Sequence, residues 1–146
     1  VATLAGGGTR YNAHLLKEVR TYDSAELVDV YDEPPAEIVD IEPENLQAVL
    51  QGMRDLVVSG SVAYYFKDCV VDAAAKTGTA QTGGKVSNGV FVAFAPYDDP
   101  QIAVAIVIEK GGSGAALAST AVQVLNAYFS NTSASSAITG ENTLLG

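Results

Sequence analysis

The stretch AAAKTGTAQTGGKVSNGVFVAFAPYDDPQIAVAIVIE, residues 73–109, decides the fold. With the four residues before it, it predicts three strands, because short runs of apolar and β-branched residues alternate with turns that contain glycine or proline. The predicted strands are Cys69–Ala80, Val90–Ala95 and Ile102–Glu109. Both connections are short, so consecutive strands are expected to pair antiparallel.

Helices are expected on either side of this sheet in the sequence. Pro43 lies at the start of a run with apolar residues at helical spacing, which predicts a helix to about Val58. Gly114–Phe129 has an apolar stripe and is expected to pack on one face of the sheet. We therefore predict the α+β class, an antiparallel sheet with flanking helices.

The remaining segments give weaker patterns. Val1–Ala5 predicts the last turn of a helix that ends at three glycines. Thr9–Tyr22 predicts a strand pair or a strand and a loop, and Leu27–Tyr31 predicts a further strand. Val62–Phe66 has no clear period. We expect residues 1–130 to form part of one domain and residues 131–146 to form a C-terminal tail.

Lys76, Thr77, Gly78 and Thr79 combine a charge, two hydroxyls and a residue without Cβ on one strand. Side chains alternate along a strand, so the hydroxyls of Thr77 and Thr79 should project the same way and hold one carboxylate beside the Lys76 charge. Gly78 would let another backbone approach the strand edge, and the Thr79 N–H is a candidate donor to an oxyanion. The simpler alternative is a solvent-facing run that leads into a turn.

Composition excludes several classes of function. The net charge is −9, and 11 of the 17 acidic residues lie between residues 18 and 55, which argues against nucleic acid as a partner. The longest apolar runs are strand-sized, and no basic segment followed by an apolar run indicates a signal peptide. The chain opens in mid-pattern, so we expect a fragment whose targeting segment lies upstream.

Other candidate sites do not reach the spacing that their chemistry requires. Cys69 is the single cysteine and lies in an apolar run, which favours packing over a role as nucleophile. His14 is the single histidine, so we expect no metal site and no cofactor. The glycines around Lys85 and Gly112 match neither a P-loop nor a dinucleotide fingerprint and are interpreted as connections.

The segment AAAKTGTAQTGGK, followed by VFVAFAP, IAVAIVIE and the helix after it, resembles the C-terminal part of a penicillin-binding protein transpeptidase domain. VATLAGGGTRYNAHLL and ENLQAVLQGMRDLVVSGSV are similar to the family segments after the second motif and before the third-motif strand. The resemblance covers roughly residues 1–130 and is greatest to class B, monofunctional members of the cell-elongation kind.

The resemblance implies a serine β-lactamase/transpeptidase-like fold, present here in part, and acyl transfer on peptidoglycan stem peptides that end in D-Ala-D-Ala. It implies that Lys76 makes the pocket positive, that the hydroxyls of Thr77 and Thr79 bind the carboxylate of the stem peptide or of a β-lactam, and that the Thr79 N–H forms half of the oxyanion hole. Gly78 and Gln81 are expected to contact substrate as well. The full-length protein would be membrane-anchored and extracytoplasmic, with no anchor in this chain.

The sequence departs from the family pattern at the nucleophile. The family requires S-x-x-K and S-x-N, and no serine of this chain has lysine three residues on or asparagine two residues on. We expect both motifs upstream, in the rest of the same transpeptidase domain, and predict that the isolated chain is inactive. Such a fragment would expose apolar surface, so oligomers are expected.

Three alternatives remain on the sequence. A serine β-lactamase shares the K-T-G strand, although the T-A-Q continuation favours the transpeptidase. A sensor relative would be acylated by β-lactams and would signal instead of cross-linking. A non-catalytic module would bind extended peptides at the edge formed by Thr77 and Thr79.

Overall fold

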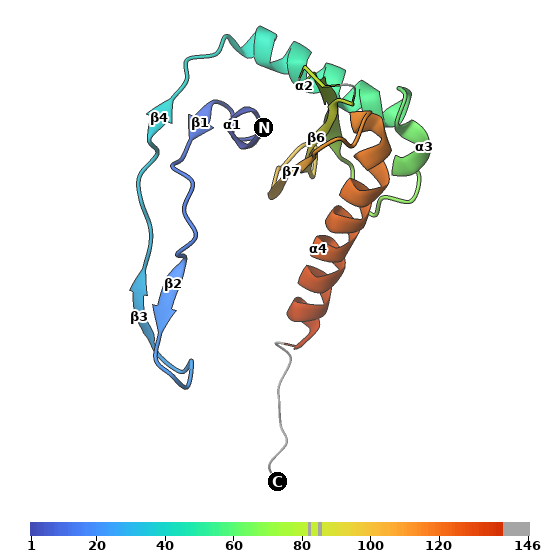
Figure 1. Cartoon of the computed structure of the whole chain (residues 1–146). Coiled ribbons are helices and arrows are strands. Elements are labelled where there is room, and N and C mark those ends of the chain that lie inside the picture. Colours follow the sequence, from blue (N-terminus) through green and yellow to red (C-terminus); the bar gives the residue numbers. More distant parts are fainter. Residues whose placement is uncertain (82, 85, 139–146) are drawn as a thin grey trace.

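The computed structural model describes residues 1–81, 83–84 and 86–138. Its central unit is an antiparallel sheet of three strands, β5 (Ala74–Ala80), β6 (Asn88–Ala95) and β7 (Ile102–Ile108), in the order β5-β6-β7 (Figure 1). The predicted α+β class and the antiparallel pairing of consecutive strands are confirmed. β5 is therefore an edge strand with β6 as its neighbour.

The register of the sheet divides its residues between two faces. Ala75 lies opposite Ala93 and Thr77 lies opposite Phe91, so these residues share one face. This face is covered by the 3₁₀ helix η1 (Gly114–Leu117) and the helix α4 (Ala118–Ile138), which continue one another.

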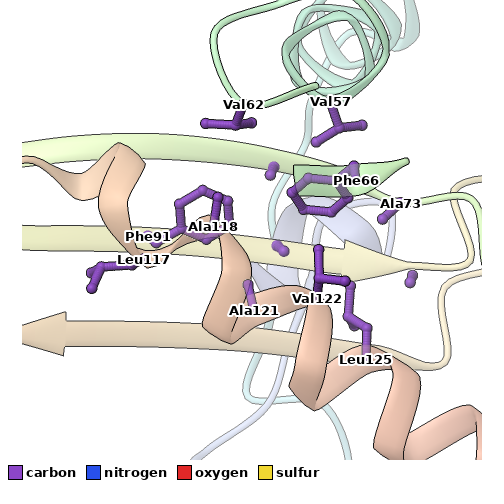
Figure 2. Close-up of a cluster of buried hydrophobic side chains, with 13 residues drawn as sticks. Val57, Val62, Phe66, Ala73, Phe91, Leu117, Ala118, Ala121, Val122 and Leu125 are labelled. Carbon is purple, nitrogen blue, oxygen red and sulfur yellow. The ribbon is translucent and has the colours of Figure 1, made fainter. Parts of the chain in front are cut away.

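The covered face forms the main core (Figure 2). Phe91 and Leu125 are its largest fully buried side chains, and each contributes about 1.5–3 kcal/mol by leaving water. The other buried members come from α2, α3, the sheet, η1 and α4; they are Val57, Val62, Phe66, Ala73, Ala75, Ala93, Ala95, Leu117, Ala118, Ala121 and Val122. The C-terminal helix is thus anchored on the sheet by its first two turns.

The helix α2 (Pro43–Val58) has the predicted bounds, with Pro43 in its first turn. Its Arg54 donates a hydrogen bond of 2.9 Å to the carbonyl oxygen of Ala73 and forms an ion pair with Asp72. The same guanidinium lies 5.7 Å from the ring centroid of Tyr97, after β6. These contacts hold the start of β5 against α2. The ambiguous segment after α2 forms a short helix, α3 (Ala63–Phe66).

Residues 9–40, here termed the arm, extend away from the sheet (Figure 1). After the short helix α1 (Ala2–Ala5), β1 (Thr9–Arg10) pairs with β4 (Glu37–Ile38), and β2 (Glu18–Arg20) pairs with β3 (Leu27–Val30). The predicted strand in Leu27–Tyr31 is confirmed. The segment Thr9–Tyr22 contains two strands, but they pair with later strands instead of with each other.

The first predicted strand begins too early. Residues 69–73 lie outside β5, which begins at Ala74, because the Cys69 N–H donates to the carbonyl of Phe66 and the Val70 N–H donates to the side chain of Asn126. These donors are therefore unavailable to a sheet. β6 begins at Asn88, two residues before the predicted start, and β7 ends one residue before the predicted end.

The C-terminal helix is longer than predicted. α4 continues to Ile138, so the helix passes through the residue where we placed the start of a tail. The rest of that tail, residues 139–146, lies outside the described residues, as do Thr82 and Lys85 of the predicted turn. Among the residues that are described, no helix combines the length and apolar character needed to cross a membrane.

Candidate functional site

The Lys-Thr-Gly-Thr run lies on β5, in continuous register with β6 from Lys76↔Val92 to Thr79↔Gly89. Lys76 and Thr79 are exposed, and Thr77 and Gly78 are half-buried. The expectation that these four residues stand on an accessible strand at the border of a sheet is therefore confirmed for their position. Their catalytic and binding roles stay predictions.

The backbone of Thr79 faces the open side of β5. Gly78 lies opposite Val90 of β6, and a Cβ placed on Gly114 would be within 2.9 Å of the N and O atoms of Gly78 and of the O atom of Val90. These three atoms therefore lie close together between the two strands, so the polar backbone atoms of Gly78 point toward β6. Because alternate residues of a strand direct N–H and C=O to opposite sides, those of Thr77 and Thr79 point away from β6. The Thr79 N–H is thus available to a ligand at the edge.

The side chain of Lys76 supplies positive charge at the same edge. Its Nζ donates a hydrogen bond of 2.5 Å to the carbonyl oxygen of Thr77. That contact agrees with the outward direction of the Thr77 carbonyl. Side-chain alternation places Thr77 and Thr79 on one face and Lys76 on the other, so the charge and the two hydroxyls flank the edge from both sides.

Gly78 is confined by its own sheet. A Cβ on Gly78 would lie 3.3 Å from the Cβ of Val90, closer than most such contacts, so Val90 would have to shift by a few tenths of an ångström. The expected approach of a substrate backbone at Gly78 stays a prediction. The close approach that the structure does contain comes from Gly114.

Gly114, at the start of η1, is the residue that sequence reasoning missed. A Cβ on Gly114 would overlap the carbonyl oxygens of Val90 and Gly78 and would lie 2.9 Å from the Gly78 nitrogen. We interpreted the glycines at 111–114 as a connection, and the only available signal was a glycine at the start of a helix that follows a strand. Its contact partner, Gly78, lies 36 positions earlier in the sequence, so no local pattern could predict the contact.

Two further hydrogen bonds tie the segment before η1 to the β5–β6 connection. The Gly112 N–H donates to the carbonyl of Ser87 at 2.9 Å, and the Lys110 N–H donates to the side chain of Asn88 at 2.9 Å. Gln81, the remaining predicted substrate contact, is exposed directly after β5. The end of β5 that carries the candidate site is thus fixed from the side of the C-terminal helix.

Cys69 and His14 stand apart from this arrangement. Cys69 is half-buried against the main core, and burial raises the pKa of its thiol, as expected for a packing residue. His14 lies in the arm, where the centroid of its ring is 4.1 Å from that of Tyr31 in a tilted arrangement and its Nδ1 contacts the carbonyl oxygen of Leu16 at 2.7 Å.

Comparison with known proteins gives an independent identification. A family model described as the penicillin binding protein transpeptidase domain matches residues 1–129. Penicillin-binding protein 2A of Bacillus subtilis is 34% identical over 122 residues, covering 74% of this chain and 17% of the relative. Peptidoglycan D,D-transpeptidase MrdA of Escherichia coli K12 is 32% identical over 111 residues, covering 64% of this chain and 17% of the relative.

Solved structures show the same similarity. Pseudomonas aeruginosa PBP2, determined in complex with WCK 5153, superposes with a TM-score of 0.69 at 33% identity, over 87% of this chain and 28% of that one. The present chain therefore spans less than a third of each of these relatives.

Proposed function

Since the chain belongs to the penicillin-binding protein transpeptidase domain family, we propose that it forms one wall of the active site of a peptidoglycan D,D-transpeptidase. The observation that carries the proposal is the position of Lys-Thr-Gly-Thr on an edge strand, with Lys76 and Thr79 exposed and the Thr79 N–H directed outward. Such an edge can bind an extended peptide by strand addition and its carboxylate by charge and hydroxyl groups.

The reaction is acyl transfer between stem peptides. The hydroxyl oxygen of a serine attacks the carbonyl carbon of the penultimate D-Ala, and its proton passes to a general base. The tetrahedral oxyanion would accept a hydrogen bond from the Thr79 N–H. The C–N bond then breaks, terminal D-Ala leaves as a protonated amine, and an amine of a neighbouring stem peptide displaces the serine from the ester.

The residues of β5 would act on the leaving side of this reaction. Lys76 and the hydroxyls of Thr77 and Thr79 would bind the carboxylate of the terminal D-Ala, with Gly78 and Gln81 against the peptide. A β-lactam carries an equivalent carboxylate beside a strained amide, so the same groups would orient it toward the serine. We propose an extracytoplasmic location for the full-length protein, because its substrate is the cell wall.

The nucleophile must come from outside residues 1–146. No serine in this sequence has the S-x-x-K or S-x-N spacing, which supports a site completed by other parts of the full-length protein. The persistence of the acyl-enzyme in that protein separates a transpeptidase from a serine β-lactamase, which would hydrolyse it.

Intact-mass measurement after incubation with penicillin tests the proposal. We expect the isolated 146-residue chain to show no adduct, because it carries one wall of the site only, and the full-length protein to gain one penicillin per molecule. A stoichiometric adduct on the isolated chain would contradict the location of the nucleophile. An unmodified full-length protein, shown to be folded by circular dichroism, would contradict the function itself.

A further inference from the structure

The start of the C-terminal helix packs closely against the peptide group that carries the proposed oxyanion donor. Gly114 sits over Gly78 and Val90 so closely that a single added methyl group would overlap both of their carbonyl oxygens. The neighbouring Ser113 accepts a hydrogen bond of 3.3 Å from the Ala115 N–H, which fixes the first turn. The contact therefore joins a fixed helix start to the middle of the Lys-Thr-Gly-Thr run.

The Gly78 carbonyl and the Thr79 N–H belong to one planar trans peptide group. A force on the Gly78 oxygen therefore rotates the Thr79 N–H by the same angle. Because hydrogen bonds weaken steeply as they bend, the direction of this N–H determines how well it stabilises an oxyanion.

We propose that Gly114 is a positioning residue, which sets the direction of the Thr79 N–H by resting against the Gly78 peptide. The inference rests on the proposed function of Thr79. Gly114 itself would touch neither the substrate nor the reacting atoms.

Substitution of Gly114 would move β5 more readily than the helix. Leu117 and Ala118, in the next turn, are buried in the main core and hold the helix start in place (Figure 2). β5 is an edge strand supported by β6 alone within its sheet. A methyl group at position 114 would overlap both the Val90 oxygen of β6 and the Gly78 oxygen of β5. Because β6 is held by a strand on each side, we expect β5 to give way and the Gly78–Thr79 peptide to tilt.

The test uses the full-length protein and separates binding from acylation. For Gly114→Ala we expect the first-order rate constant of acylation by penicillin to fall about 10-fold, part of the loss seen when an oxyanion donor is removed. The dissociation constant of the complex before acylation should stay within about twofold. Affinity for a boronic acid that forms a tetrahedral serine adduct should fall by the same factor as the acylation rate.

Two further variants make the result interpretable. Gly52→Ala, in α2 where a Cβ would meet nothing within 4 Å, should leave all three constants unchanged. Ser113→Ala removes the hydrogen bond that fixes the first turn, loosens the helix start over the Gly78 peptide, and should slow acylation about threefold. It retains a test if Gly114→Ala does not fold.

The outcomes are distinct. A parallel loss in acylation rate and boronate affinity supports the inference. An unchanged acylation rate constant in the folded variants overturns it. A loss only in the fraction of active protein, or a slower acylation rate with unchanged affinity for the boronic acid, also overturns it. Failure of the unchanged protein to be acylated would overturn the proposed function of the site instead.

Discussion

At the scale of single residues, the candidate site combines exposed residues of β5 with a buried glycine that packs against the same strand. Lys76 and Thr79 are exposed, whereas Gly114 is buried against the strand that carries them. The Lys-Thr-Gly-Thr run could be predicted from the sequence, because its charge and hydroxyls are adjacent on one strand. Gly114 could not, because its requirement arises only where the helix start meets Gly78.

Cys69 provides a prediction about reactivity. Burial raises the pKa of its thiol, so at pH 7 it should react with iodoacetamide more slowly in the folded protein than in denaturant. Because the folded pKa lies above the unfolded one, the thiol contributes stability below the unfolded pKa, and this contribution is lost as the pH rises through the folded pKa. Alkylation rates of the folded and the denatured protein, measured from pH 7 to 10, check the predicted difference in reactivity. Equal rates in the two states would contradict it.

At the scale of elements, local signals predicted the bounds of α2 better than the start of β5. The bounds of α2 agree with the prediction because Pro43 and the apolar spacing are both local features. The start of β5 depends on Asn126, which lies 56 residues after Val70 and takes its N–H. The pairing of β1 with β4 likewise depends on a distant partner, and the sequence around Thr9 holds no sign of it.

Asn126 allows a test of this competition. Its side chain accepts a hydrogen bond of 2.9 Å from the Val70 N–H and donates one of 3.0 Å to the carbonyl of Asp68, which holds the segment before β5 on α4. Asn126→Ala leaves both backbone groups without this partner and should cost about 1–3 kcal/mol. Thermal unfolding of the full-length protein measures the loss. The exposed Gln123→Ala on the same helix is the control, and equal effects of the two variants would refute the assignment.

At the scale of the whole molecule, the face of the sheet opposite α4 is only partly covered. Met53, Ala74 and Phe94 form a small cluster at one end, whereas Val107 on β7 is 63% exposed. The arm also exposes large apolar side chains, among them Leu15 and Tyr22. The sequence predicted exposed apolar surface from the resemblance, but it could not place that surface, because the register that puts Val107 outward is set by β6.

We predict that the isolated chain self-associates, since exposed apolar patches of this kind are unfavourable in water. Light scattering during gel filtration should show a mass that rises with protein concentration, and Val107→Lys should reduce the rise. The control is Thr120→Lys, at an exposed position of α4. A concentration-independent monomer would contradict this prediction.

The most direct test of the central claim compares penicillin with its carboxylate methyl ester on the full-length protein. If Thr77 and Thr79 bind the carboxylate on the β5 edge, the free acid should bind before acylation about 10- to 100-fold more tightly than the ester, the range of a charge-assisted hydrogen bond. The double variant Thr77→Val and Thr79→Val should lose most of that preference, whereas the exposed Thr120→Val on α4 should keep it. An undiminished preference for the acid in the double variant would contradict the account.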